Sequence, residues 1–211
     1  MLSISNLTCE RDDRILFYHL NYEFPVGKIV QLEGKNGAGK STLLRILAGL
    51  YSSYMGGVLW GGLPVSSSKI EFNADMLFIG HKSAIKPTLT PLENLRFLIG
   101  LHQSFHEKEL YKALESVGLF GYEDVLCRNL SAGQQRRVAL ARLYLSNAKI
   151  WLLDEIFTAI DKEGVTQLEA YLHQKAQSGV SIILTTHHQL SISDIQVLDL
   201  GMYASREEVS E

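Results

Sequence analysis

The stretch from Gly34 to Thr42 constrains this chain more than any other, because it reads Gly-Lys-Asn-Gly-Ala-Gly-Lys-Ser-Thr and fits the pattern G-x-x-x-x-G-K-[ST] in full. The apolar run from Lys28 to Leu32 predicts a short buried strand before it. Leucine and isoleucine then recur at helical spacing as far as Gly49. A glycine-rich turn with a chance Lys-Ser would not carry these flanks. The sequence therefore predicts an α/β domain built around a phosphate-binding loop, or P-loop.

The residue types of this loop suit a nucleoside triphosphate. Glycines let consecutive backbone N–H groups face inward around a phosphate, and the positive end of the following helix adds to the field there. We expect Lys40 to reach the β- and γ-phosphates and the Ser41 hydroxyl to coordinate Mg²⁺. The residues expected to hold the nucleotide are Gly34, Lys35, Asn36, Gly37, Ala38, Gly39, Lys40, Ser41 and Thr42.

The bulk properties favour one globular domain over residues 1–211. A net charge of −3 gives no electrostatic reason to expect nucleic acid as a partner. Cys9 and Cys127 lack metal-ligand spacing and favour a reducing compartment. The amino terminus does not resemble a signal peptide, and no uncharged apolar run reaches about 18 residues. If the chain works at a membrane, we expect a partner to supply the membrane-spanning part.

Periodicity predicts two kinds of structure along the chain. Residues 1–33 indicate antiparallel strands with a polar turn at 11–13, residues 51–65 a short hairpin, and Met76–Ile79 a buried strand. From Pro91 the period becomes helical, so we expect residues 82 to about 146 to form a helical subdomain inserted into the α/β frame.

The frame resumes with four consecutive apolar residues, Ile150 to Leu153, which predict a central parallel strand covered by helices on both faces. A helix from Gly164 to Gln177, a buried strand from Val180 to Thr186 and one more short strand after Gln196 follow.

Two acidic residues, Asp154 and Glu155, end the apolar strand. Alone, they are as readily interpreted as a solvated acidic turn. Together with the P-loop they favour catalysis. Asp154 would hold the Mg²⁺ water shell beside Ser41, and Glu155 would act as general base or water-orienting group for attack on the γ-phosphate.

The stretch Leu130–Gln134, which reads Leu-Ser-Ala-Gly-Gln, combines a structural and a functional signal. Ser131 followed by Gln134 is a capping box and predicts a helix start there. A small glycine-containing turn at a helix amino terminus also accepts anions. Since the P-loop already holds the chain's own phosphates, this second turn suggests a phosphate offered by another chain.

With these motifs in order, nearly the whole chain resembles the ATP-binding cassette family. The P-loop is similar to its Walker A motif, Leu130–Gln134 to its signature, residues 150–155 to Walker B, residues 158–161 to the D-loop, and residues 185–187 to the switch-histidine motif. The resemblance implies a head-to-tail homodimer with each ATP between one P-loop and the partner's signature.

The same resemblance implies roles for individual residues. The signature residues that would contact the partner's nucleotide are Ser131, Gly133 and Gln134, and Asp161 would join them from the D-loop. His187 would contact the γ-phosphate, the alternative being a polar residue that caps a strand end.

A closer resemblance is to the ATPase subunits of the cytochrome c maturation system. It rests on residues 6–12, 31–34, 80–82, 89–96 and 132–137. It implies an integral membrane permease subunit, a haem chaperone complex and a peripheral place on the cytoplasmic face of the bacterial inner membrane. The segment from His81 to Leu92 would receive the coupling helix of the membrane subunit.

The chain departs from the cassette pattern at several positions. His81 stands where a Q-loop glutamine is usual, and it could still bind a metal-bound water or a γ-phosphate oxygen. Arg11 stands about where an aromatic residue stacks on adenine, and a guanidinium plane can do the same. Ala132 and Ile156 replace a usual glycine and proline without removing a group that touches phosphate.

Two rival functions stay open at this stage. A transporter with a different cargo is the stronger rival, because the membrane subunit selects the cargo. A soluble cassette protein acting on DNA or ribosomes is the weaker one, because such proteins usually carry two cassettes or long coiled-coil or basic insertions. The sequence does not decide whether haem itself is moved or a haem-loaded chaperone is released.

Overall fold

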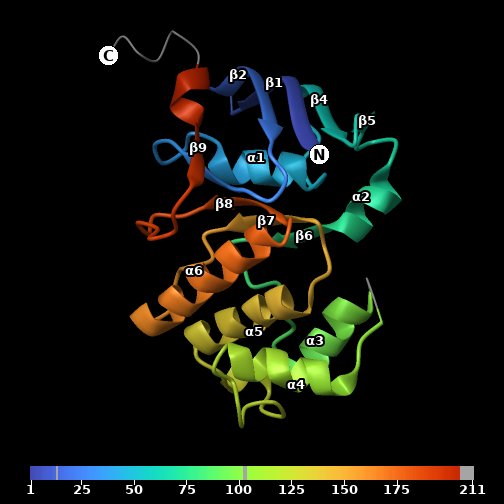
Figure 1. Ribbon diagram of the computed structural model, residues 1–211, viewed down its shortest axis with the longest axis vertical. Helices are drawn as coiled ribbons and strands as arrows, with labels where there is room; N and C mark the ends of the chain where they lie inside the picture. The colour runs from blue at the N-terminus through green and yellow to red at the C-terminus, as the bar shows by residue number, and fades with distance from the viewer. Residues whose placement is uncertain (13, 102–103, 205–211) are drawn as a thin grey trace. The chain divides into compact units, whose positions relative to one another are not determined.

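The computed structural model describes residues 1–12, 14–101 and 104–204, and the chain divides into two compact units (Figure 1). The first comprises residues 1–78, 148–155 and 169–211. The second comprises residues 79–147 and 156–168. The helical insertion expected at 82–146 thus corresponds to most of the second unit.

An antiparallel sheet with strand order β2-β1-β4-β5 forms one layer of the first unit. Its strands are β1 (Leu2–Arg11), β2 (Arg14–Phe24), β4 (Met55–Trp60) and β5 (Leu63–Pro64). The predicted lead-in strands and the predicted hairpin are confirmed, and Asp13 of the predicted turn lies outside the described residues. β1 also pairs with β4, a contact across some 50 residues that local pattern did not indicate.

The P-loop strand belongs to a second sheet, with strand order β6-β7-β8-β3-β9. Its strands are β3 (Ile29–Glu33), β6 (Met76–Ile79), β7 (Ile150–Asp154), β8 (Ser181–Thr185) and β9 (Ile195–Asp199). Every residue of β7 and β8 is buried, and β8 pairs in parallel with both β7 and β3. This confirms the interpretation of the unalternating apolar runs as strands covered on both faces.

Helix α1 (Lys40–Leu47) follows the P-loop and lies between the two sheets in Figure 1. Its apolar side chains, among them Leu43 and Leu44, join a core cluster with Leu2 and Phe17 from the antiparallel sheet and Leu152 from β7. This core fixes the start of α1 under the P-loop. A short helix α2 (Lys69–Asp75) precedes β6, and a 3₁₀ turn η2 (Leu200–Tyr203) follows β9.

The second unit contains α3 (Pro91–Gly100), α4 (Glu107–Ser116), the 3₁₀ turn η1 (Cys127–Asn129) and α5 (Ala132–Leu145), in accord with the predicted change of period. Leu95, Leu110, Leu114 and Val138 are fully buried in its own core cluster. The buried amide of Asn94 ties the loop before α3 to the helix, since its Oδ1 accepts from Lys86 N at 2.7 Å.

Helix α6 spans Lys162–Gln177 and starts two residues before the predicted Gly164. Residues 156–168 cluster with the second unit, although the sequence pattern placed them with the frame. The Arg137 guanidinium of α5 pairs with Asp161 just before α6, and this contact holds the segment to the second unit.

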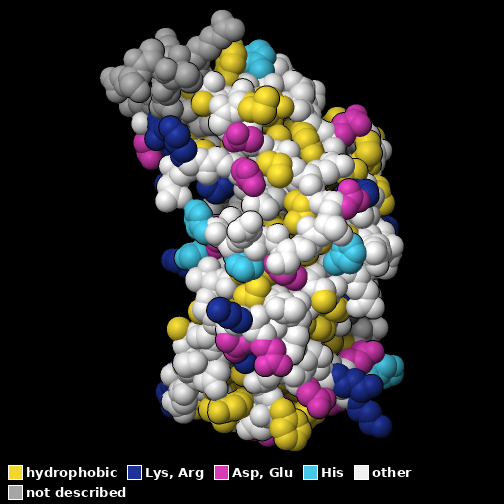
Figure 2. Space-filling view, turned by 60° about the vertical axis from the view of Figure 1, so that its left-hand side comes forward, with side chains coloured by type: hydrophobic (Ala, Val, Ile, Leu, Met, Phe, Trp, Pro, Cys, Tyr) yellow, Lys and Arg dark blue, Asp and Glu magenta, His cyan; other side chains and the backbone are white. Residues whose placement is uncertain are grey.

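On the face shown in Figure 2, hydrophobic side chains lie singly or in small groups among charged and polar ones. None of the helices within residues 1–12, 14–101 and 104–204 has the length and apolarity that a membrane crossing requires.

Candidate active site

The P-loop connects β3 to α1 through a backbone that requires glycine. Gly34, Gly37 and Gly39 all have positive φ angles, and Gly39 is the N-cap of α1 with φ 94°. A Cβ at Gly39 would lie 3.1 Å from Leu16 Cβ and 3.2 Å from the Phe17 ring. Glycine is therefore needed at this position both for the backbone angle and for the close approach of β2.

The Lys40 side chain lies across its own loop. Its Nζ donates to Gly34 O at 2.6 Å and to Lys35 O at 3.2 Å, so the ammonium group faces the concave side of the loop. An ammonium in this position is a point charge for phosphate oxygens, as the motif predicts.

The Ser41 hydroxyl and the Asp154 carboxylate meet, although they are 113 residues apart. Ser41 Oγ donates to Asp154 Oδ1 at 2.9 Å, and Asp154 is 1% exposed. Thr185 Oγ1, at the end of β8, donates to the same oxygen at 2.8 Å. Parallel strands β7 and β8 end at one edge of the sheet, so their last residues reach the same point beside α1.

This pair of groups suits Mg²⁺. The ion prefers oxygen ligands, keeps several waters and uses one or two carboxylates together with substrate phosphates. Ser41 and Asp154 supply one hydroxyl and one carboxylate within hydrogen-bond distance. In the described part of the chain, no group of three or more His, Cys, Asp or Glu side chains is placed so that it could hold a metal ion by itself.

Glu155 and His187 face each other beside the P-loop. Glu155 Oε1 lies 3.6 Å from His187 Nε2, and the exposed fractions of their side chains are 18% and 68%. Glu155 has φ 52°, an uncommon angle for a residue with a side chain, and its N donates to Thr185 Oγ1 at 3.1 Å. Unusual backbone of this kind concentrates at functional sites.

A cavity of about 480 Å³ unites the P-loop with Glu155 and His187. Its lining residues are Arg11, Asp12, Arg14, Leu16, Asn36, Gly37, Gly39, Lys40, Ser41, Thr42, Glu155 and His187. Arg11 lines it and pairs with Asp12 at 3.3 Å. The sequence did not predict that Arg14 and Leu16 line this cavity, because the local pattern of β2 does not indicate which of its residues face the P-loop.

The other predicted binding residues lie on the second unit. Ser131 is the N-cap of α5, and its Oγ accepts from Gln134 N at 3.2 Å while Gln134 Oε1 accepts from Ser131 N at 2.9 Å. The predicted capping box is thereby confirmed. A Cβ at Gly133 would lie 3.0 Å from Ala159 O, so a larger side chain would press on the segment that leads to Asp161. Their contact with a nucleotide stays a prediction.

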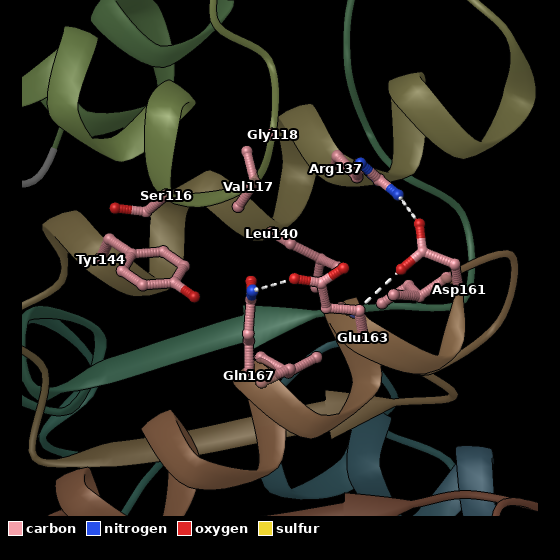
Figure 3. Close-up of a pocket in the computed structure, with 12 residues that line it drawn as sticks. Ser116, Val117, Gly118, Arg137, Leu140, Tyr144, Asp161, Glu163 and Gln167 are labelled. Carbon is pink, nitrogen blue, oxygen red and sulfur yellow. Dashed lines mark hydrogen bonds and ion pairs between the residues drawn. The ribbon is translucent and has the colours of Figure 1, made fainter.

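Asp161 anchors the start of α6. It accepts from Gly164 N at 2.8 Å and pairs with Arg137, and these contacts hold the pKa of its carboxyl below the ordinary value. Figure 3 shows Asp161 and Arg137 at one side of a cavity of about 240 Å³, with Tyr144 and Gln167 at the other. The structure thus gives Asp161 a helix-capping and ion-pairing role, and its predicted nucleotide contact stays a prediction.

His81 is exposed and follows β6. The buried guanidinium of Arg136 donates from Nη1 to Gly80 O at 2.8 Å and to His81 O at 3.2 Å. The backbone at His81 is therefore tied to the signature helix α5, a contact that sequence spacing could not indicate. The predicted role of His81 toward metal or phosphate stays a prediction.

The fold and the site together define a P-loop nucleotide hydrolase of the cassette class. The protein-family model described as "ABC transporter" matches residues 17–158. Among solved structures, a putative ABC transporter ATP-binding protein from Pyrococcus furiosus has a TM-score of 0.82 at 24% identity, covering 97% of this chain and 99% of that one. A dimeric bacterial ABC transporter cassette has a TM-score of 0.81 at 23% identity, with 95% of each chain covered.

Curated relatives narrow the assignment. The cytochrome c biogenesis ATP-binding export protein CcmA of Hahella chejuensis is 50% identical over 95% of this chain and 96% of its own length. The protein of the same name from Vibrio cholerae is 51% identical over 90% of this chain and 92% of its own. The chain therefore belongs to the ABC transporter family and, within it, to the CcmA group of ATP-binding proteins.

Proposed function

We propose that this chain is the ATP-hydrolysing subunit of an ABC exporter that serves cytochrome c biogenesis. One structural observation carries the enzymatic part: the P-loop, Glu155 and His187 line one cavity, at the edge where Asp154 also meets Ser41. The biological part is supported by about 50% identity, over almost the whole chain, to proteins named for cytochrome c biogenesis.

Each residue of the first unit has a distinct chemical role in this proposal. Lys40 and the P-loop N–H groups bind the β- and γ-phosphates, and Ser41 and Asp154 would hold Mg²⁺, which neutralises phosphate charge when bound. Glu155 orients the attacking water and accepts its proton, and His187, 3.6 Å away, donates a hydrogen bond to the γ-phosphate. Arg11 stacks on the base, which makes base selectivity loose.

A second copy of the chain completes the site. The amino terminus of α5 presents Ser131, Gly133 and Gln134, with Asp161 and Arg137 bracing the segment beside them. A helix amino terminus attracts anions, and each P-loop already holds its own phosphates, so this surface takes the γ-phosphate bound by the partner in a head-to-tail homodimer. ATP then favours the closed dimer, because it adds contacts made only in that state.

The remaining parts of the proposal concern location and cargo. The cassette dimer docks peripherally on an integral membrane permease at the cytoplasmic face of the inner membrane, and the segment from His81 to Leu92 receives that subunit. Hydrolysis drives either haem export or release of a haem-loaded chaperone. An ABC transporter for another cargo is the alternative, since the permease does the selecting.

Covalent haem staining of membrane proteins tests this function. Host cells carry either the native chain or Glu155→Gln in its place, a change that keeps side-chain size and removes the carboxylate. We expect all c-type cytochrome bands to vanish in the variant, with b-type haem spectra unchanged. Normal c-type bands would exclude cytochrome c biogenesis, and the cargo would then be sought through the membrane protein that co-purifies.

A further inference from the structure

Glu169, on the buried side of α6, is a charged residue that the proposed chemistry does not use. It is 7% exposed, and the other buried charged residues among those described are Asp154 and Arg136. Burying a carboxylate costs several kcal/mol unless other groups compensate its charge. The groups that contact the Glu169 carboxylate therefore indicate which part of the structure it stabilises.

Glu169 contacts His188 and Ser191, which both lie in the loop between β8 and β9. His188 Nε2 lies 3.3 Å from Glu169 Oε1, and Ser191 N donates to the same oxygen at 3.1 Å. The loop is also fixed at its start, where His188 N donates to Thr186 Oγ1 at 2.9 Å, and near its end, where Lys28 pairs with Asp194. Glu169 Oε1 thus contacts two residues of the loop, His188 and Ser191, that are three positions apart.

His187, the residue that faces Glu155, is the second residue of this loop. His187 and His188 are joined by one planar peptide bond. A contact that fixes the His188 side chain therefore also limits the direction in which the His187 side chain points. The His187 side chain is 68% exposed, so most of its surface faces solvent rather than other side chains. Its 3.6 Å approach to Glu155 therefore depends on how the loop is held.

We propose that Glu169 is a positioning residue for ATP hydrolysis, acting through His188 and Ser191 to keep His187 beside Glu155. The inference rests on the function proposed above and adds to it a residue outside the nucleotide cavity. Leu168 and Leu172 on the same helix are buried apolar side chains, and replacing Glu169 leaves both of them unchanged. Loss of Glu169 is therefore expected to affect turnover more than folding.

Steady-state kinetics of the full-length chain test this role. Glu169→Ala removes both contacts, whereas Glu169→Gln keeps an oxygen that can accept from Ser191 N. We expect kcat to fall on the order of 10- to 100-fold in the alanine variant, since a displacement of about 1 Å can cost this much. We expect the glutamine variant to lose less, about 3- to 10-fold, because it keeps an acceptor for Ser191 N but not the negative charge that faces His188. The affinity for Mg²⁺-ATP should change less than about 2-fold in both, because the P-loop is untouched.

Gln174→Ala is the matched control, since Gln174 is exposed on the same helix and should leave kcat unchanged. The decisive measurement is Glu169→Gln made in a His187→Ala background. If Glu169 acts through His187, the Glu169→Gln substitution lowers the rate of single-turnover hydrolysis in the native background but not in the His187→Ala background. This comparison also decides the matter if Glu169→Ala fails to fold.

Equal fold losses in both backgrounds, or an unchanged kcat in Glu169→Ala, would overturn the positioning role. Absence of ATP hydrolysis by the native chain would instead overturn the proposed function itself, so the two failures are distinguishable.

Discussion

Thr185 links the two acidic residues of the site, and its replacement by valine should be costly although the two side chains have the same shape. Thr185 is 1% exposed; its Oγ1 donates to Asp154 Oδ1 at 2.8 Å and accepts from Glu155 N at 3.1 Å. A hydrogen bond to a charged group contributes about 1.5–3 kcal/mol. In the valine variant Glu155 N still has a second acceptor, Thr185 O at 3.2 Å, so losing the bond from Glu155 N to Oγ1 adds little to the cost.

We therefore expect Thr185→Val to lower the free energy of unfolding by about 2–3 kcal/mol. For a domain of this size, that corresponds to a fall in Tm of about 4–12 °C. Equilibrium urea unfolding measures the first quantity and calorimetry the second. Thr166→Val is the control: Thr166 is exposed on α6, its Oγ1 donates to Lys162 O at 3.1 Å, and the change should stay within about 0.5 kcal/mol. A Thr185→Val loss no larger than that of the control would refute this account of the strand-end network.

Three further predictions concern other contacts of the chain. Asn94→Ala should lower the free energy of unfolding by about 2–4 kcal/mol, because the buried amide accepts from Lys86 N and donates to three carbonyl groups. Urea unfolding measures this loss, and an unchanged stability would contradict the prediction. Asp161→Asn should lower Tm at neutral pH. The hydrogen bond from Gly164 N and the pairing with Arg137 lower the pKa of the Asp161 carboxyl in the folded state from its ordinary 3.8. The stabilisation is therefore fully present above pH 3.8 and is lost as the pH falls through the folded-state pKa. A Tm difference that persists unchanged in stronger acid would contradict this assignment. Lys40→Ala should weaken Mg²⁺-ATP binding at least about 10-fold in a nucleotide titration, as expected for loss of a charge-assisted contact, and unchanged affinity would remove Lys40 from the site.

The local signals in the sequence predicted most of the elements. β6 begins and ends as predicted at Met76 and Ile79, and the capping box at Ser131 marks the start of α5. These features depend on nearest neighbours: residues flanking an apolar run, or two polar side chains three positions apart. The P-loop motif likewise predicted the backbone around Gly39, because few other sequences can adopt it.

The contacts that sequence reasoning missed join residues far apart in the chain. Arg136 reaches the carbonyl groups of Gly80 and His81 across some 55 positions, and Glu169 holds Ser191 across 22. A buried arginine or glutamate has no distinctive local pattern, since the same residues on a helix usually face solvent. The pairing of β1 with β4 was missed for the same reason, because strand partners depend on topology rather than on composition.

Glu155, which follows β7, is the residue that we expect to drive hydrolysis of the ATP held by the P-loop. A phosphate-release assay and analytical ultracentrifugation of the Glu155→Gln chain with Mg²⁺-ATP test this role most directly, with Lys40→Ala as the variant of weakened nucleotide affinity. We expect a stable ATP-bound dimer and negligible phosphate release for Glu155→Gln, and monomers for Lys40→Ala. Native rates of phosphate release from Glu155→Gln would contradict it.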